Sequence, residues 1–185
     1  MEVNLHLNNT SDTFVQTSFM RHLLLAFLIQ VSFTAFAQVD TLLPPYKRYP
    51  TLPPLQLFLA DSATKYTKAD LPKKKPLLLI LFSPDCEHCQ HEAREIVAHA
   101  EEFKDIHIIM STTYPIYRMT AFAASYGLDK LSNVVMAKDP YYLLISFYDI
   151  KNLPFMALYN KKGDLIETMA GTVAIEKVLT AFKAK

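Results

Sequence analysis

A continuous apolar run is the feature that most restricts how this chain can fold. Residues 77–81 read Leu-Leu-Leu-Ile-Leu, and Phe82 extends the run before the segment Ser-Pro-Asp-Cys-Glu-His-Cys. Because polar residues do not alternate with the apolar ones, the run predicts a strand that is buried on both faces of a sheet. Such a strand belongs in a sheet that carries helices on both sides.

The residues that follow the run predict a helix. Apolar positions recur at helical spacing, and glutamates fill the remaining faces. The apolar positions are Cys89, Ala93, Ile96, Val97, Ala100 and Phe103, and the glutamates are Glu92, Glu95, Glu101 and Glu102. We therefore expect an amphipathic helix of about four turns, with Glu101 and Glu102 on a solvated face.

The remainder of the chain alternates between strand and helix patterns. Strands are expected at 55–60, 106–110, 133–136, 155–159 and 165–169, and helices at 116–126, 139–147 and 172–182. Gly127 suits a left-handed helix end, and Asp139-Pro140 suits a helix start. The turn at 160–163 predicts a hairpin. This order indicates an α/β fold with a central mixed, mostly parallel sheet and helices on both faces.

The N-terminal residues resemble a signal peptide. A basic region at 20–22 precedes an apolar stretch at 23–29, and Ala35-Phe36-Ala37 precedes Gln38. We expect cleavage after Ala37, so that residues 1–37 are the signal peptide. Polar residues interrupt the apolar stretch before the roughly 20 residues that a membrane span needs, so no permanent span is expected after cleavage. The polar residues before Met20 favour Met20 as the true start.

Export and composition together limit the function. We expect a periplasmic or extracellular protein, with a proline-rich extended leader at 38–54 and one domain at 55–185, acting as a monomer. A cysteine pair in such an oxidising compartment normally forms a disulfide. The chain is 51% hydrophobic, which excludes disorder. Its net charge is only +1, from 19 basic and 18 acidic residues, so a nucleic-acid partner has no support.

The two cysteines are placed for redox chemistry. Cys86 lies where the buried strand gives way to a helix N-terminus, whose free N–H groups and dipole stabilise a thiolate. Because a thiolate is the attacking species in disulfide exchange, Cys86 is the expected nucleophile. Cys89 lies about one helical turn further on, so it can resolve a mixed disulfide formed at Cys86.

The residues around the pair are expected to tune it in opposite directions. A protonated His88 would stabilise the thiolate, whereas Asp85 and Glu87 would destabilise it. The net effect does not follow from the sequence, so both reductase and oxidase behaviour stay open.

Two segments resemble the thioredoxin-like superfamily, and more narrowly its exported thiol–disulfide oxidoreductases of the TlpA/ResA kind. They are "LLLILFSPDCEHC" and "YDIKNLPFMALYNKKGDLI", and the resemblance runs from about residue 55 to 182. It implies a three-layer sandwich and a cis-proline at Pro154. It also implies that Leu153 and Pro154 present their backbone to a substrate protein. The partners would be protein thiols or disulfides and an upstream redox protein, with no cofactor besides the Cys86–Cys89 disulfide.

The chain departs from that family at two positions. Asp85 stands where the family usually has a tryptophan, and the chain has no Trp at all. Ile80 stands at the position of the buried acid of thioredoxins. A proton acceptor for Cys89 is therefore not evident, and Glu92 or a water is the expected substitute.

Two other functions stay open. Cys86 and Cys89 with His88 or His91 could bind copper or zinc, although a second ligand pair is missing. Alternatively, the disulfide could merely fasten a helix start in a non-catalytic binding module, although so short a loop gains little chain entropy. The charged run at 73–75 is interpreted as a solvated turn.

Overall fold

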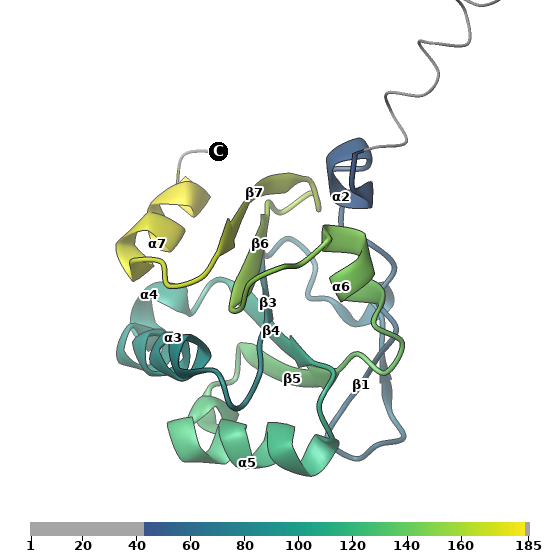
Figure 1. Ribbon diagram of the computed structural model, residues 1–185. Coiled ribbons are helices and arrows are strands. Elements are labelled where there is room, and N and C mark those ends of the chain that lie inside the picture. The colour runs from purple at the N-terminus through teal and green to yellow at the C-terminus, as the bar shows by residue number, and fades with distance from the viewer. Residues whose placement is uncertain (1–42, 184–185) are drawn as a thin grey trace, which may run out of the picture. The chain divides into compact units, whose positions relative to one another are not determined.

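The computed structural model of the chain describes residues 43–183, and the expected signal peptide lies outside them. Seven strands form one mixed sheet (Figure 1). They are β1 (Leu57–Phe58), β2 (Lys65–Tyr66), β3 (Leu77–Leu81), β4 (His107–Thr112), β5 (Val134–Lys138), β6 (Phe155–Tyr159) and β7 (Leu165–Ala170). Their order in the sheet is β2-β1-β5-β4-β3-β6-β7. The predicted α/β fold with a mixed sheet is confirmed.

Strand β3 lies inside the sheet, between β4 and β6. It pairs parallel to β4 and antiparallel to β6. All five of its residues are buried, as the uninterrupted apolar run predicted. Its side chains alternate between two hydrophobic clusters: Leu78 and Ile80 enter one, while Leu77, Leu79 and Leu81 enter the other. Burying each such side chain contributes about 1.5–3 kcal/mol to the stability of the fold, so β3 stabilises both hydrophobic clusters.

Helices cover both faces of the sheet. They are α2 (Pro45–Arg48), α3 (Glu87–Ala98), α4 (Ala100–Phe103), α5 (Ile116–Tyr126), α6 (Leu143–Tyr148) and α7 (Ile175–Lys183), with short 3₁₀ turns at Lys68–Asp70 and Leu128–Lys130. Residues of α3, α4, α5 and α7 join the cluster on one face. Residues of α2 and α6 join the cluster on the other. Within residues 43–183, every helix is too short or too polar to span a bilayer.

The segment before residue 55 differs from the expected extended leader. Residues 45–48 are helical, because Pro44 stands at the N-cap and Pro45 at the first helical position, where a missing N–H costs nothing. Leu52 is buried at 4% exposure. Thr51 forms an isolated antiparallel bridge with Asp164. Residues 44–54 therefore pack against the sheet, and the interpretation of this part as a spacer is wrong.

Several helix and strand limits also differ from the predictions. Helix α6 begins at Leu143 instead of residue 139. Asp139 lies before the helix, and its carboxylate accepts hydrogen bonds from the N–H groups of Leu143 and Leu144 at 3.2 and 2.9 Å. The long helix expected through residue 103 is interrupted at His99, which separates α3 from α4. The strand expected at 55–60 is only two residues long and pairs with β2, which the sequence did not indicate.

Candidate active site

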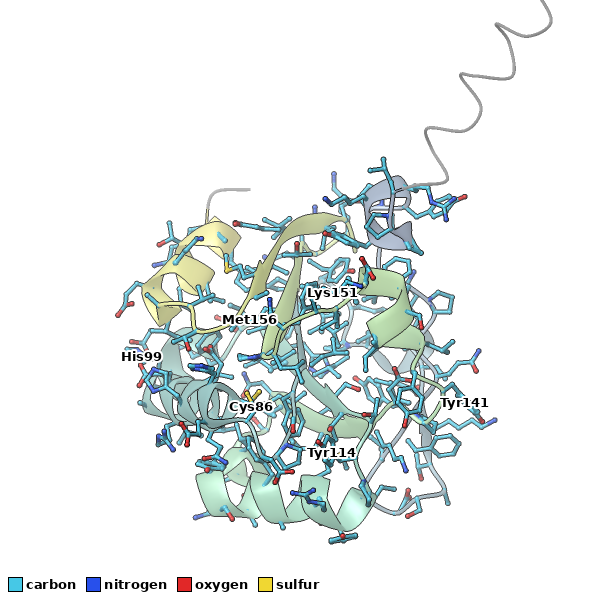
Figure 2. All side chains as sticks on the ribbon, viewed as in Figure 1. Cys86, His99, Tyr114, Tyr141, Lys151 and Met156 are labelled. Carbon is cyan, nitrogen blue, oxygen red and sulfur yellow. The ribbon has the colours of Figure 1, made fainter. Side chains whose placement is uncertain are left out.

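Cys86 is the N-cap of α3, at the end of the loop that leaves β3. The backbone N–H of Cys89 donates a hydrogen bond to the Cys86 sulfur at 3.3 Å. The same sulfur lies 3.7 Å from the carbonyl oxygen of Leu153, which can accept from the thiol. Cys86 is partly exposed at the helix end (Figure 2). Its sulfur is thus accessible and is held by a donor that also suits a thiolate.

Cys89 is in a different environment although it lies one turn away. It is 1% exposed and belongs to the cluster packed between α3 and the sheet. Burial raises the pKa of the Cys89 thiol, and its hydrogen bond with Cys86 raises it further. Both residues are free thiols in this structure. The pair therefore consists of one accessible sulfur and one buried thiol that needs a proton acceptor.

The segment at Leu153-Pro154 reaches this pair across 67 residues of sequence. The peptide bond between Leu153 and Pro154 is cis, and Pro154 is buried. Strand β6 begins at the next residue and pairs with β3, which leads to Cys86. The antiparallel pairing of β3 and β6 thus places the end of one strand beside the start of the other. All four residues predicted at the centre of the site, Cys86, Cys89, Leu153 and Pro154, come together here.

Glu92, expected from the sequence as a substitute proton acceptor for Cys89, is buried. It is 1% exposed, and within residues 43–183 neither of its carboxyl oxygens has a hydrogen-bond partner. It lies one turn beyond Cys89 on α3, close enough for its charge to raise the pKa of that thiol. Burial, and to a smaller extent the charge of Glu95, raises the pKa of Glu92 to about 7. A carboxyl with such a pKa can exchange protons near neutral pH.

Glu92, and not Ile80, is the buried titratable group near Cys89. Ile80 is fully buried in the same cluster as Cys89 and supplies only packing. The titratable group near Cys89 therefore lies on α3 and not on β3. The helical spacing of the apolar residues leaves Glu92 to the other faces of the helix, so its burial is not evident from the sequence pattern.

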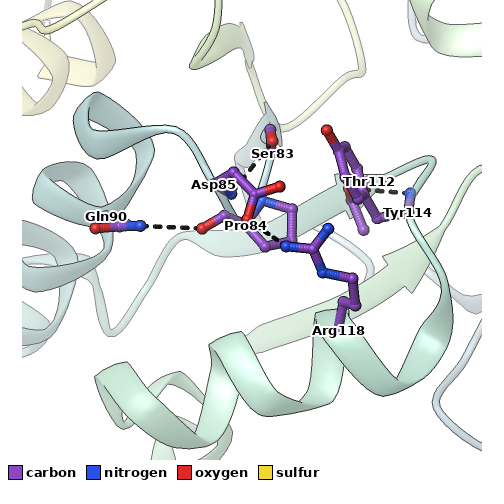
Figure 3. A network of polar contacts seen from close by, with 7 residues as sticks. All are labelled: Ser83, Pro84, Asp85, Gln90, Thr112, Tyr114 and Arg118. Atoms are coloured by element: carbon purple, nitrogen blue, oxygen red, sulfur yellow. Dashed lines mark hydrogen bonds and ion pairs between the residues drawn. The ribbon is translucent and has the colours of Figure 1, made fainter.

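Asp85 is paired with Arg118, a residue that the sequence analysis missed. The Arg118 guanidinium, from α5, donates to the Asp85 carboxylate (Figure 3). This contact raises the pKa of Arg118. The guanidinium also lies 4.9 Å from the ring centre of Tyr114. The negative charge next to Cys86 is therefore opposed by a fixed cation, and 33 residues of sequence separate the two partners.

The loop that carries the cysteines is fixed by further contacts. The Asp85 N–H donates to the Ser83 hydroxyl at 3.3 Å, and the Gln90 side chain donates to the Pro84 carbonyl at 3.0 Å (Figure 3). His88 is exposed, and its Nδ1 lies 2.8 Å from the hydroxyl of Thr172. Glu87 is exposed. Of the three residues expected to tune the thiolate, Asp85 and His88 are thus held by other side chains.

The described residues offer little for a metal ion. Between residues 43 and 183, no three His, Cys, Asp or Glu side chains are grouped so that they could hold one. His91 is exposed on α3. His99 interacts with Glu95 and Glu102, and His107 with Tyr66, so neither is brought to the cysteines.

Comparison with known proteins identifies the fold. No protein-family model and no curated protein sequence matches the chain. A secreted Mycobacterium tuberculosis disulfide oxidoreductase homologous to Escherichia coli DsbE is similar in structure, with a TM-score of 0.59 and 18% identity over 71% of this chain and 96% of that one. StoA from Bacillus subtilis gives 0.55 and 16%, over 71% and 98%. The peroxidoxin BcpB from M. tuberculosis gives 0.61 and 14%, over 72% and 94%. The chain has a thioredoxin-like fold.

Proposed function

We propose that this protein is a thiol–disulfide oxidoreductase that acts on protein substrates outside the cytoplasm through Cys86-Glu-His-Cys89. The observation that carries the proposal is the pairing of an accessible sulfur at a helix N-cap with a buried thiol one turn away. The arrangement matches the two roles that disulfide exchange needs, a nucleophile that meets the substrate and a second thiol that displaces it. The similar solved structures, which include disulfide oxidoreductases, support this class.

In the first step, the Cys86 thiolate attacks one sulfur of a substrate disulfide. A bond forms between that sulfur and Cys86, the substrate S–S bond breaks, and the departing substrate thiolate takes a proton from water. The N–H of Cys89 and the N-terminal end of α3 stabilise the negative charge on Cys86 before the attack. The carbonyl of Leu153, beside the sulfur, offers backbone to a substrate chain.

In the second step, Cys89 loses its proton to the Glu92 carboxylate and attacks the Cys86 sulfur. The Cys86–Cys89 disulfide forms, and the second substrate sulfur leaves as a thiolate that is then protonated. The substrate gains two electrons and two protons, and the protein dithiol loses them. An upstream redox protein would restore the dithiol, and the reverse sequence would oxidise a substrate dithiol. Glu92 suits this role because its pKa of about 7 lets it accept a proton at neutral pH.

We further propose the narrower TlpA/ResA type and export of the protein. The Leu153-Pro154 segment beside Cys86 is the feature that the TlpA/ResA resemblance implies, and the predicted signal peptide would deliver the protein to an oxidising compartment. N-terminal sequencing of the exported protein tests the location. A chain that begins at Gln38 is the expected result, and an intact N-terminus would contradict it.

A trapping experiment tests the proposed roles. Cys89→Ser leaves Cys86 able to attack and removes the thiol that resolves the product, so a disulfide-bonded peptide should accumulate as a stable adduct on Cys86. Intact-mass spectrometry under non-reducing conditions detects it. The matched Cys86→Ser variant retains only the buried Cys89 and should form no adduct. Adduct formation through Cys89 in that variant, or none in Cys89→Ser, would refute the assignment.

Two measurements separate catalysis from the alternatives. The reduction potential of the pair, measured against glutathione, should lie above about −300 mV for a catalytic disulfide and below it for a purely structural one. Titration of the reduced protein with Cu(I) and Zn(II) tests metal delivery. Tight stoichiometric binding without exchange activity would favour the metal function over the one proposed.

A further inference from the structure

A cavity lies at the end of the sheet opposite the cysteines. It occupies about 220 Å³ between the start of β3 and the turn that joins β6 to β7. Leu77, His107 and Tyr159 lie side by side in one row of the sheet and form part of its lining. Because β3 rises about 3.3 Å per residue, its far end, which leads to Cys86, lies about 13 Å away. The cavity is separate from the redox site.

Lysines from three segments surround this cavity. The six are Lys68, Lys73, Lys74, Lys75, Lys161 and Lys162. They come from a 3₁₀ turn, from the chain that enters β3 and from the β6–β7 turn. None of the described residues that line the cavity is Asp or Glu. The nearest carboxylates in sequence, Asp70 and Asp164, are held by hydrogen bonds to Thr67 and Asn160.

This concentration of charge is unusual for the chain as a whole. The protein has 19 basic residues and a net charge of only +1, yet six of its cations line one cavity. Like charges so close together repel one another and weaken the folded state unless an anion neutralises them. The sequence run at 73–75 had suggested only a solvated turn. The fold adds three more lysines to it from elsewhere in the chain.

The interior of the cavity is suited to a bound ligand. Lys68 is fixed in place, since its ammonium donates to the Leu52 carbonyl at 2.8 Å. His107 is 8% exposed, and its Nε2 lies 2.8 Å from the Tyr66 hydroxyl. Leu52, Leu71 and Leu77 add apolar surface. The cavity, at about 220 Å³, has room for a small molecule.

We propose that the lysine-lined cavity between β3 and the β6–β7 turn binds a small, multiply charged anion of the phosphate or carboxylate class. Lysine ammonium groups bind such anions as point charges, and several at once favour a ligand with more than one negative charge. The site does not depend on the thiols.

Calorimetric titration of the purified protein with inorganic pyrophosphate and with citrate, at low ionic strength, tests the proposal. Saturable one-to-one binding of at least one of them is expected. The triple variant Lys73→Gln, Lys75→Gln and Lys162→Gln should bind at least tenfold more weakly. The matched variant Lys104→Gln, Lys130→Gln and Lys177→Gln removes the same charge from exposed positions elsewhere and should bind within twofold of the wild type.

Three results would overturn the anion site. The first is the absence of saturable binding to both anions. The second is an equal loss of affinity in the two triple variants, which would show a general effect of net charge. The third is binding to vesicles that contain phosphatidylglycerol without binding to either soluble anion, which would assign the lysines to a lipid surface. A Cys86→Ser, Cys89→Ser double variant should retain full affinity, and loss of binding there would contradict a separate site.

Discussion

Glu92 ties the stability of the protein to pH. Its pKa is raised from an ordinary value of 4.5 to about 7, so between these limits the folded state holds a proton that the unfolded state has released. Stability therefore falls as pH rises from about 4.5 to 7, by about 1.4 kcal/mol per pH unit and about 3 kcal/mol in all. Below pH 4.5 this group has no effect, and above pH 7 its full cost is present.

Glu92→Gln should remove that dependence. Glutamine keeps the shape and carries no charge, so the variant should be more stable than the wild type by about 3 kcal/mol above pH 7 and similar to it below pH 4.5. Urea unfolding of the reduced wild type and variant at a series of pH values measures the two free energies of unfolding. Glu101→Gln, at an exposed position on α4 whose charge does not contribute to the pKa shift of Glu92, is the control and should keep the wild-type slope. An equal slope in Glu92→Gln would contradict the burial argument.

Arg118 should influence the reactivity of Cys86 through Asp85. Removing the guanidinium leaves the Asp85 charge unopposed beside the sulfur, which disfavours the thiolate. Arg118→Gln should lower the rate of Cys86 alkylation by iodoacetamide at pH 7 by about two- to fivefold, a modest effect because the pair is solvent-exposed. Arg94→Gln, which removes a cation that stacks on Tyr126, should leave the rate unchanged.

A double variant tests whether Arg118 affects Cys86 through the charge of Asp85 or through a loss of structure. If Arg118 acts only by opposing Asp85, then Asp85→Asn should react faster than the wild type, and adding Arg118→Gln to it should change little. A further fall in rate in the double variant would mean that Arg118 acts on Cys86 by another route.

At the scale of elements, the end of α5 depends on Gly127. This residue has φ of 75°, in the left-handed region, and its N–H closes the helix on the carbonyls of Ala123 and Ala124. A Cβ at Gly127 would meet no atom within 4 Å, so a substitution costs backbone strain alone. Gly127→Ala should destabilise the protein by about 1–2 kcal/mol, measured by urea unfolding.

Gly127→Asn provides the matched comparison, because asparagine tolerates this conformation better than alanine does. It should cost clearly less than Gly127→Ala. Equal losses for the two variants would show that side-chain contacts, not the backbone, set the requirement for glycine.

Local signals in the sequence decided which elements could be predicted. Helix α5 and strand β6 have the expected limits. Their signals, the periodicity of apolar residues and the C-cap glycine of α5, depend only on residues close together in the sequence. The start of α6 was misplaced, because Tyr142 takes a positive φ of 57° and the Asp139 carboxylate reaches over the turn that this creates. Such a turn depends on packing that the pair Asp139-Pro140 does not reveal.

The same distinction holds at the candidate site. The spacing of Cys86 and Cys89 and the family resemblance at Pro154 indicated the residues that come together. Arg118 did not appear in the sequence pattern, and Glu92 appeared there as a substitute proton acceptor without any sign that it is buried. Arg118 reaches Asp85 from another helix, and Glu92 is buried only because α3 lies against the sheet. Interactions between elements require the fold before they can be assigned.

At the scale of the whole molecule, the domain includes the residues before 55. Leu52 belongs to the cluster on the α2 and α6 face, beside Leu77 and Tyr159. The Pro50 carbonyl accepts the N–H of Leu165, and the N–H of Leu52 donates to the Gly163 carbonyl. These contacts join the N-terminal segment to the β6–β7 hairpin at the far end of the chain, so this segment stabilises the sheet that carries the site.

Leu52→Ala should therefore destabilise the protein by about 2–5 kcal/mol, the range for truncating a buried leucine to alanine. Urea unfolding measures the loss. Leu43→Ala makes the same chemical change at 42% exposure and should cost less than about 0.5 kcal/mol. Similarly small losses of stability at both positions would indicate that residues 44–54 are a leader outside the domain. A large loss at Leu52 alone would show that the folding unit begins ahead of residue 55, because this side chain packs in the same cluster as β3 and β6.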